Sequence, residues 1–108
     1  MNKLQEINVQ ALKNKLDNKE DFILVDVREK QELDVCKIKD AIHIPMGVIS
    51  ARLNKINFDK PVIVMCKSGG RSAQVCQFLN EQGYSNIYNL NGGIIRWALE
   101  IDTNMKMY

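Results

Sequence analysis

The residues most able to do chemistry lie in one short loop, Cys66–Arg71, with the sequence CKSGGR. Glycine reaches backbone angles that other residues cannot, so Gly69 and Gly70 can turn successive amides inward. Amides arranged in this way form a cationic nest, and a helix beginning near Arg71 would add its positive N-terminal end. The loop therefore predicts a binding site for an anion beside a sulfur atom.

The same surroundings predict that Cys66 is ionised and nucleophilic. Inward-facing amides, the helix end and the charges of Lys67 and Arg71 all stabilise a thiolate over a thiol, which lowers the pKa of Cys66. A cysteine at a strand end is more often a small buried hydrophobe, but the glycines and cations here favour a reactive one. Preorganised donors would also stabilise a negatively charged intermediate on the sulfur.

Strands and helices alternate around this loop. The apolar run 62–65, directly before Cys66, predicts a strand buried on both faces, and 73–82 predicts a helix that ends at Gly83. Further strands are expected over 22–27, 41–45 and 87–90. Further helices are expected after the N-cap Asn8, over 49–56 and over 95–101.

This order predicts an α/β fold with a mostly parallel sheet and helices on both faces. Ligands of such sheets gather at the carboxyl ends of the strands, which is where Cys66 falls. The length of 108 residues predicts a single domain over residues 1–102, with residues 103–108 frayed.

Composition narrows the possible partners. A net charge of +2 argues against a nucleic-acid partner, and no apolar run approaches the ~20 residues needed to span a membrane. Three cysteines, an odd number without zinc-like spacing, argue against a disulfide framework and a structural metal. We therefore expect a reduced, cytoplasmic and monomeric protein without a cofactor.

Four segments resemble those of single-domain rhodanese-like sulfurtransferases of the thiosulfate sulfurtransferase type. They are LVDVRE (24–29), AIHIP (41–45), PVIVMCKSGGRSA (61–73) and NLNGGIIRW (89–97). Their order and spacing extend the resemblance over about residues 7–102. It implies a five-stranded parallel sheet and a cysteine that carries a persulfide.

Carried over by position, the resemblance makes Cys66 both sulfur acceptor and sulfur donor. The pocket around its sulfur would be lined by Lys67, Ser68, Gly69, Gly70 and Arg71. The implied enzyme takes a sulfur atom from a small anionic donor such as thiosulfate and releases sulfite. It then passes the sulfur from the Cys66 persulfide to cyanide in vitro, or to a protein or low-molecular-weight thiol in the cell.

One segment departs from the family pattern. Residues 36–40 stand where the family commonly has Gly-His-Ile-x-Gly, and only Ile38 is kept. This difference affects partner or substrate preference more than the chemistry. Cys36, in this segment, could be exposed near the pocket, although a resolving or sulfur-relaying role for its thiol is the weaker expectation. Cys76, ten residues after Cys66, is expected in the core.

Asp26 and Arg28 follow a buried strand at its carboxyl end. They could orient the active-site loop from behind, but support of the fold is the stronger expectation, with Glu29 or Glu32 as the partner of Arg28. His43 is expected to make a structural hydrogen bond.

Two other functions use related features. Cysteine-dependent phosphatases and arsenate reductases also cradle an oxyanion between a cysteine and an arginine, but their loop is one residue longer than 67–70. The shorter loop disfavours in-line attack on phosphate, and it holds no acid to protonate a leaving alkoxide. A binding module, or a persulfide carrier that works only on a partner, remains the main alternative.

Overall fold

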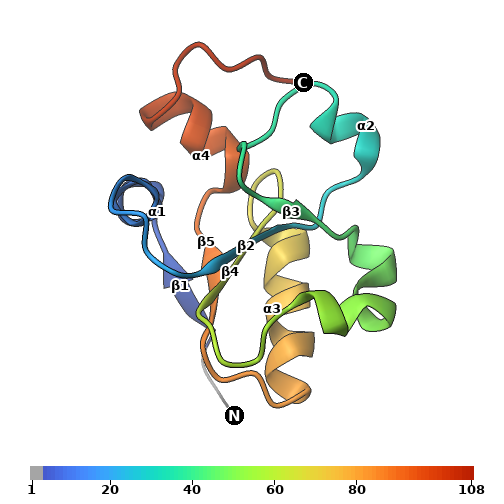
Figure 1. The fold of residues 1–108 in the computed structure, drawn as a ribbon. Helices are drawn as coiled ribbons and strands as arrows, with labels where there is room; N and C mark the ends of the chain where they lie inside the picture. The colour runs from blue at the N-terminus through green and yellow to red at the C-terminus, as the bar shows by residue number, and fades with distance from the viewer. Residues whose placement is uncertain (1–3) are drawn as a thin grey trace.

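A computed structural model describes residues 4–108, and Figure 1 shows a central sheet covered by helices. The strands are β1 (Gln5–Ile7), β2 (Ile23–Asp26), β3 (Ile42–His43), β4 (Val62–Met65) and β5 (Ile87–Leu90). The helices are α1 (Val9–Asp17), α2 (Lys30–Leu33), the 3-10 helix η1 (Met46–Lys55), α3 (Gly70–Glu81) and α4 (Gly93–Glu100).

All strand pairs are parallel, in the order β1-β5-β4-β2-β3. The predicted α/β fold with a five-stranded parallel sheet is therefore confirmed. The central strand β4 is buried along its whole length, which explains its unbroken run of apolar residues.

Alternate residues of β4 enter two different cores. Val62, Val64 and the following Cys66 face a cluster that includes Ile49 of η1 and Leu79 of α3. On the other face of the sheet, Ile63 and Met65 join Leu12 of α1 and Trp97 of α4 in a second cluster. Because successive side chains of a strand point to opposite faces, one strand anchors both helical layers.

Two local elements differ from the prediction. The edge strand β1 was not expected from the residues, because QEI has only one apolar side chain and no run to mark it. The segment predicted as an ordinary helix over 49–56 is instead the 3-10 helix η1, kinked at Arg52. By contrast, the predicted cap of α1 is confirmed, since Asn8 Oδ1 accepts a hydrogen bond from Ala11 N at 2.8 Å.

Residues 103–108 do not extend freely from the body, in contrast to the fraying expected from sequence. Met105 packs against the α1–α4 core cluster, and the Tyr108 hydroxyl donates to Glu32 Oε2 at 2.6 Å. These apolar and charged contacts hold the segment across the carboxyl end of the sheet, where Figure 1 places it beside α2. Of the domain predicted over residues 1–102, residues 1–3 lie outside the described part.

Within residues 4–108, no helix is long and apolar enough to cross a bilayer. The same part of the chain brings together no group of three or more His, Cys, Asp or Glu side chains suited to a metal ion.

Candidate active site

Cys66 lies at the carboxyl end of β4, with only 1% of its surface exposed. Its Sγ accepts a hydrogen bond from Gly69 N at 3.1 Å and one from Ser72 N at 3.4 Å. The hydroxyl of Ser72 lies 3.3 Å from the same sulfur. The sulfur therefore sits at the N-terminal end of α3, among donors that prefer a negative charge.

These donors determine the ionisation of the thiol. Burial raises the pKa of Cys66, but hydrogen bonds from the Ser72 hydroxyl and from the amides of Ser72, Gly69 and Ser68 more than offset it. The net pKa of Cys66 is lowered from its ordinary value. The nest of amides predicted from the glycines therefore acts in the expected direction, with the Ser72 hydroxyl as its strongest member.

Ser72 connects the sulfur to β5. Its Oγ lies 3.2 Å from Gly69 O and also contacts Asn89 Oδ1, while Asn89 Nδ2 donates to Gly69 O at 3.2 Å. A hydroxyl has a single proton, so it can donate to only one of the sulfur, the carbonyl and the amide oxygen at a time. A thiolate on Cys66 is the most strongly accepting of the three.

Only one glycine of the Gly69–Gly70 pair needs its special backbone angles. Gly69 has φ +117°, a left-handed conformation that aims its amide at the sulfur. Gly70 begins α3 without a positive φ, and a Cβ there would meet nothing within 4 Å. The sequence-based expectation that both glycines turn the loop is therefore wrong for Gly70.

The N-terminus of α4, which packs on the opposite face of the sheet from α3, holds the loop by hydrogen bonds. Ile94 N donates to Cys66 O at 3.0 Å, and Ile95 N donates to Lys67 O at 3.1 Å. This contact is possible because Gly93 has no side chain: a Cβ would come within 2.6 Å of Cys66 O and closer still to Lys67 O. Gly93 thus lets the first turn of α4 hold the loop that carries Cys66.

Neither loop cation is free. The two terminal nitrogens of Arg71 contact the two carboxylate oxygens of Glu32 at 2.7 and 2.9 Å. This arginine lowers the pKa of Glu32 to about 2, with help from the Tyr108 hydroxyl and the Glu29 amide, although burial opposes the shift. Lys67 Nζ lies 4.4 Å from the centre of the Tyr108 ring, in a cation–π contact.

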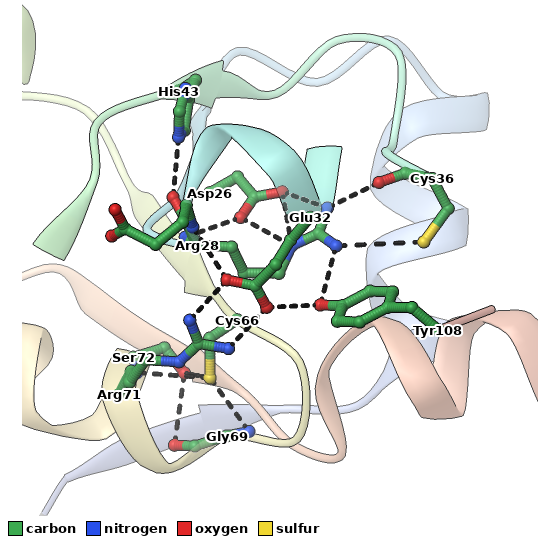
Figure 2. A network of polar contacts seen from close by, with 11 residues as sticks. Asp26, Arg28, Glu32, Cys36, His43, Cys66, Gly69, Arg71, Ser72 and Tyr108 are labelled. Carbon is green, nitrogen blue, oxygen red and sulfur yellow. Dashed lines mark hydrogen bonds and ion pairs between the residues drawn. The ribbon is translucent and has the colours of Figure 1, made fainter. Parts of the chain in front are cut away.

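Tyr108 joins three of the charged groups near the cysteine. Its hydroxyl donates to Glu32 Oε2 and accepts from Arg28 Nη1 at 3.1 Å, while its ring lies under Lys67. Figure 2 shows the resulting chain of contacts, which runs from Arg71 through Glu32 to Tyr108 and Arg28. A largely apolar groove of about 420 Å³ is lined by Lys67, by α4 and by the C-terminal residues 103–108.

Asp26 and Arg28 form a completely buried ion pair behind the loop, with three contacts between 2.8 and 3.1 Å. The carboxylates of Glu29 and Glu32, which were the expected partners, do not pair with the Arg28 guanidinium. Asp26 takes that place, and Glu32 pairs with Arg71 instead. Arg28 also donates to Cys36 O at 2.8 Å. The pair thus joins β2 to the segment after α2, which is a supporting arrangement.

Two further predictions concern side chains around this pair. His43 Nε2 lies 2.7 Å from Arg28 O, so this ring nitrogen must carry the proton and donate. Cys36 is buried and not exposed near the pocket, because its Sγ packs 3.8 Å from Arg28 Nη1 and 4.0 Å from Met107 Sδ. Cys76 is also buried in the core, and desolvation together with the negative charge of Cys66 raises its pKa to about 12. Of Cys66 and Cys76, only Cys66 has a lowered pKa.

Four residues around the site were not identified from sequence: Ser72, Asn89, Tyr108, and Glu32 in its role as partner of Arg71. A usable signal existed for Ser72, since a serine in the first turn of the helix after a reactive cysteine has both its amide and its hydroxyl near the sulfur. Asn89 interrupts an apolar strand, which marks a polar task at that position. Nothing local marks Tyr108, whose partners lie 41 to 80 residues away.

Comparison with known proteins agrees with this geometry. The family model described as "Rhodanese-like domain" matches residues 8–100. The chain belongs to the rhodanese-like sulfurtransferase family. A sulfurtransferase of Allochromatium vinosum is 42% identical over 95 residues, which cover 88% of this chain and 89% of that protein.

Solved rhodanese-like structures share the fold closely. A rhodanese-like domain protein from Staphylococcus aureus is 31% identical, with a TM-score of 0.84 over 97% of this chain and 99% of that one. An NAD-dependent persulfide reductase from A. fulgidus is also 31% identical, with a TM-score of 0.71 over 87% of this chain and 16% of that longer one. The name of the Allochromatium vinosum relative, a sulfurtransferase, agrees with the expectation from the motifs.

Proposed function

We propose that the protein is a rhodanese-type sulfurtransferase that carries a sulfane sulfur on Cys66. Thiosulfate or a related small anion is the proposed donor, and a thiol, or cyanide in vitro, is the proposed acceptor. Five loop residues would surround the transferred sulfur: Lys67, Ser68, Gly69, Gly70 and Arg71. Asp26 and Arg28 would support that loop from behind. The observation that carries the proposal is the convergence of Gly69 N, Ser72 N and Ser72 Oγ on one sulfur atom.

In the first step, the Cys66 thiolate attacks the outer sulfur of thiosulfate. A new S–S bond forms to Cys66, the S–S bond of thiosulfate breaks, and sulfite leaves with the electron pair. The total charge of −3 is conserved, since a thiolate and a dianion become a persulfide anion and the sulfite dianion. No proton moves, so the step needs no general base, and the lowered pKa of Cys66 supplies the nucleophile.

In the second step, a thiolate or cyanide attacks the terminal sulfur of the persulfide. The Cys66 thiolate is the leaving group and returns to its original hydrogen bonds. The same donors stabilise the anion before and after each transfer, so little reorganisation is needed.

Intact mass after incubation with thiosulfate tests this proposal. The reduced protein should gain one sulfur atom, and cyanide or a reductant should remove it. Cys66→Ser should gain none, whereas the control Cys76→Ala, which removes a buried thiol of raised pKa, should gain sulfur like the wild type. Sulfur gained by Cys66→Ser, or no gain by a wild type whose Cys66 is freely alkylated, would contradict the proposal.

A partner-dependent persulfide carrier is a second candidate. It is supported by the engagement of both Lys67 and Arg71 with other side chains, which leaves less free charge for a small anion. Such a carrier would accept sulfur from a protein persulfide much faster than from thiosulfate. Comparing the two donors at equal concentration separates the candidates.

We also propose that the protein acts as a monomer in the reducing cytoplasm. All three cysteines are free and buried, which is the state expected where thiols are kept reduced. Gel filtration and a thiol titration of freshly prepared extract would test both statements.

A further inference from the structure

The loop that follows Cys66 has two cations in its sequence, Lys67 and Arg71, and both contact other side chains in the structure. Arg71 is held in a two-pronged ion pair by Glu32, whose side chain is 16% exposed. Lys67 is half-buried and has its ammonium 4.4 Å from the centre of the Tyr108 ring. An anionic donor that uses Lys67 must therefore compete with this ring.

The Tyr108 ring is anchored in place from its other end. Its hydroxyl donates to Glu32 Oε2 at 2.6 Å and accepts from Arg28 Nη1 at 3.1 Å, and Arg28 is itself locked onto the buried Asp26. Figure 2 shows the hydroxyl between these two charged groups. A tyrosine fixed at its hydroxyl presents a face of constant position to Lys67, which a freely rotating side chain would not do.

We propose that Tyr108 is a specificity-determining residue, which engages the ammonium of Lys67 and so reduces the advantage of anionic over neutral reactants at the neighbouring Cys66. The consequence for sulfur donors rests on the proposed sulfurtransferase function. The effect on the positive charge beside Cys66 does not, because any reagent that attacks Cys66 experiences it. In Tyr108→Ala the ammonium becomes free to approach an incoming anion.

Alkylation of Cys66 measures the effect of the Lys67 charge in an assay that does not depend on sulfur transfer. The ratio of the rate with anionic iodoacetate to the rate with neutral iodoacetamide is measured from the mass of the Cys66 peptide. Tyr108→Ala should raise this ratio about two- to fivefold, the range expected for loss of an exposed cation–π contact. The neutral reagent corrects for any change in the accessibility or ionisation of the thiol.

Three matched variants assign the effect. Tyr108→Phe keeps the ring but loses the hydrogen bonds that anchor it, so it should raise the ratio less than Tyr108→Ala does. Tyr88→Phe removes a hydroxyl that makes no hydrogen bond to residues 4–108, and should not change the ratio. In a Lys67→Gln background, Tyr108→Ala should no longer raise the ratio, because the cation it releases is absent.

Steady-state kinetics with thiosulfate then test whether the Lys67 charge affects binding of the sulfur donor. Tyr108→Ala should lower KM about two- to fivefold and leave kcat unchanged, because Lys67 would bind the donor but not the reacting sulfur. An unchanged alkylation ratio in Tyr108→Ala, an equal rise in Tyr108→Phe, or a rise that persists without Lys67 would each overturn the proposal. If no donor gives a persulfide, the proposed function fails, but the alkylation ratio still decides the role of Tyr108.

Discussion

Two strand-to-helix turns, each with a pair of glycines, meet at Cys66 and use glycine for different purposes. In the turn from β4 to α3, Gly69 takes φ +117° so that its amide points at the sulfur. In the turn from β5 to α4, Gly93 lets two carbonyls of the first turn come closer than a Cβ would permit. One turn supplies donors to the sulfur, and the other fixes the backbone that supplies them.

The difference teaches that the reactivity of the cysteine depends on both turns. The donors near the sulfur are useful only if the loop holds one geometry, and that geometry is set by the amides of Ile94 and Ile95 on α4. Mutations in the second turn should therefore damage the site at least as much as mutations in the first, although no side chain of the second turn touches the sulfur.

The strongest test of this view is Gly93→Ala. The new Cβ would overlap Cys66 O and Lys67 O, and alanine at φ +58° is itself strained. We expect a loss of about 2–4 kcal/mol in the free energy of unfolding, measured by urea denaturation. Cys66 alkylation should also slow more than tenfold. A variant with wild-type stability and alkylation rate would show that α4 does not hold the loop.

A second test compares Gly69→Ala with Gly70→Ala. Alanine at φ +117° should cost about 1–3 kcal/mol and turn the Gly69 amide away from the sulfur, which raises the pKa of Cys66. At Gly70 the helix geometry and open space should make alanine neutral, or stabilising by up to ~1 kcal/mol. Urea unfolding and the pH profile of alkylation check both. Equal effects at the two positions would contradict the assignment.

A third test, Ser72→Ala, removes a side-chain donor near the sulfur and leaves the glycines of both turns in place. Loss of the hydroxyl raises the pKa of Cys66, so a smaller fraction of the thiol is ionised at neutral pH. The sign follows from the lowered pKa of the wild type, whose thiolate persists to lower pH than an ordinary cysteine. Alkylation at pH 7 should fall on the order of three- to tenfold, with its midpoint moved to higher pH. An unmoved midpoint would indicate that the amides alone set the ionisation.

The smallest effect is expected outside both turns, at Glu32. Its pKa of about 2 in the folded protein lies below its ordinary value of 4.5, so its contribution to stability is present above pH 4.5 and is lost as the pH falls toward 2. Glu32→Gln should lose about 1 kcal/mol or less at pH 7, because Arg71 is partly exposed, and should differ little from the wild type near pH 2. Urea midpoints at several pH values measure this difference, and a constant gap down to pH 2 would contradict the pairing.

The sequence predicts much of the fold because the information is local. Buried strands such as 62–65 are continuous apolar runs, and Asn8 and Gly83 mark helix ends by their own chemistry. The strand β1 could not be found in this way, since it depends on pairing with β5 rather than on its own residues. The 3-10 geometry of η1 and its kink at Arg52 likewise could not be predicted from the spacing of its apolar residues.

The predictable features of the site are likewise those formed by residues that are close in sequence. Cys66, its glycines and the helix behind it are adjacent in sequence, so their chemistry is readable there. The pairing of Arg71 with Glu32 and the stacking of Lys67 on Tyr108 join residues 39 and 41 positions apart. The sequence shows two cations beside a cysteine, whereas only the folded chain shows what already occupies them.

The bonds from Ile94 and Ile95 also make the reactive loop visible to hydrogen exchange. Their amides are protected from solvent deuterium only while they remain bonded to the carbonyls of Cys66 and Lys67. If the loop opens separately from the rest of the domain, these two amides exchange sooner than those in the middle of α4. The exchange rates of these two amides, which lie on the opposite face of the sheet from α3, therefore measure how often the loop around Cys66 opens.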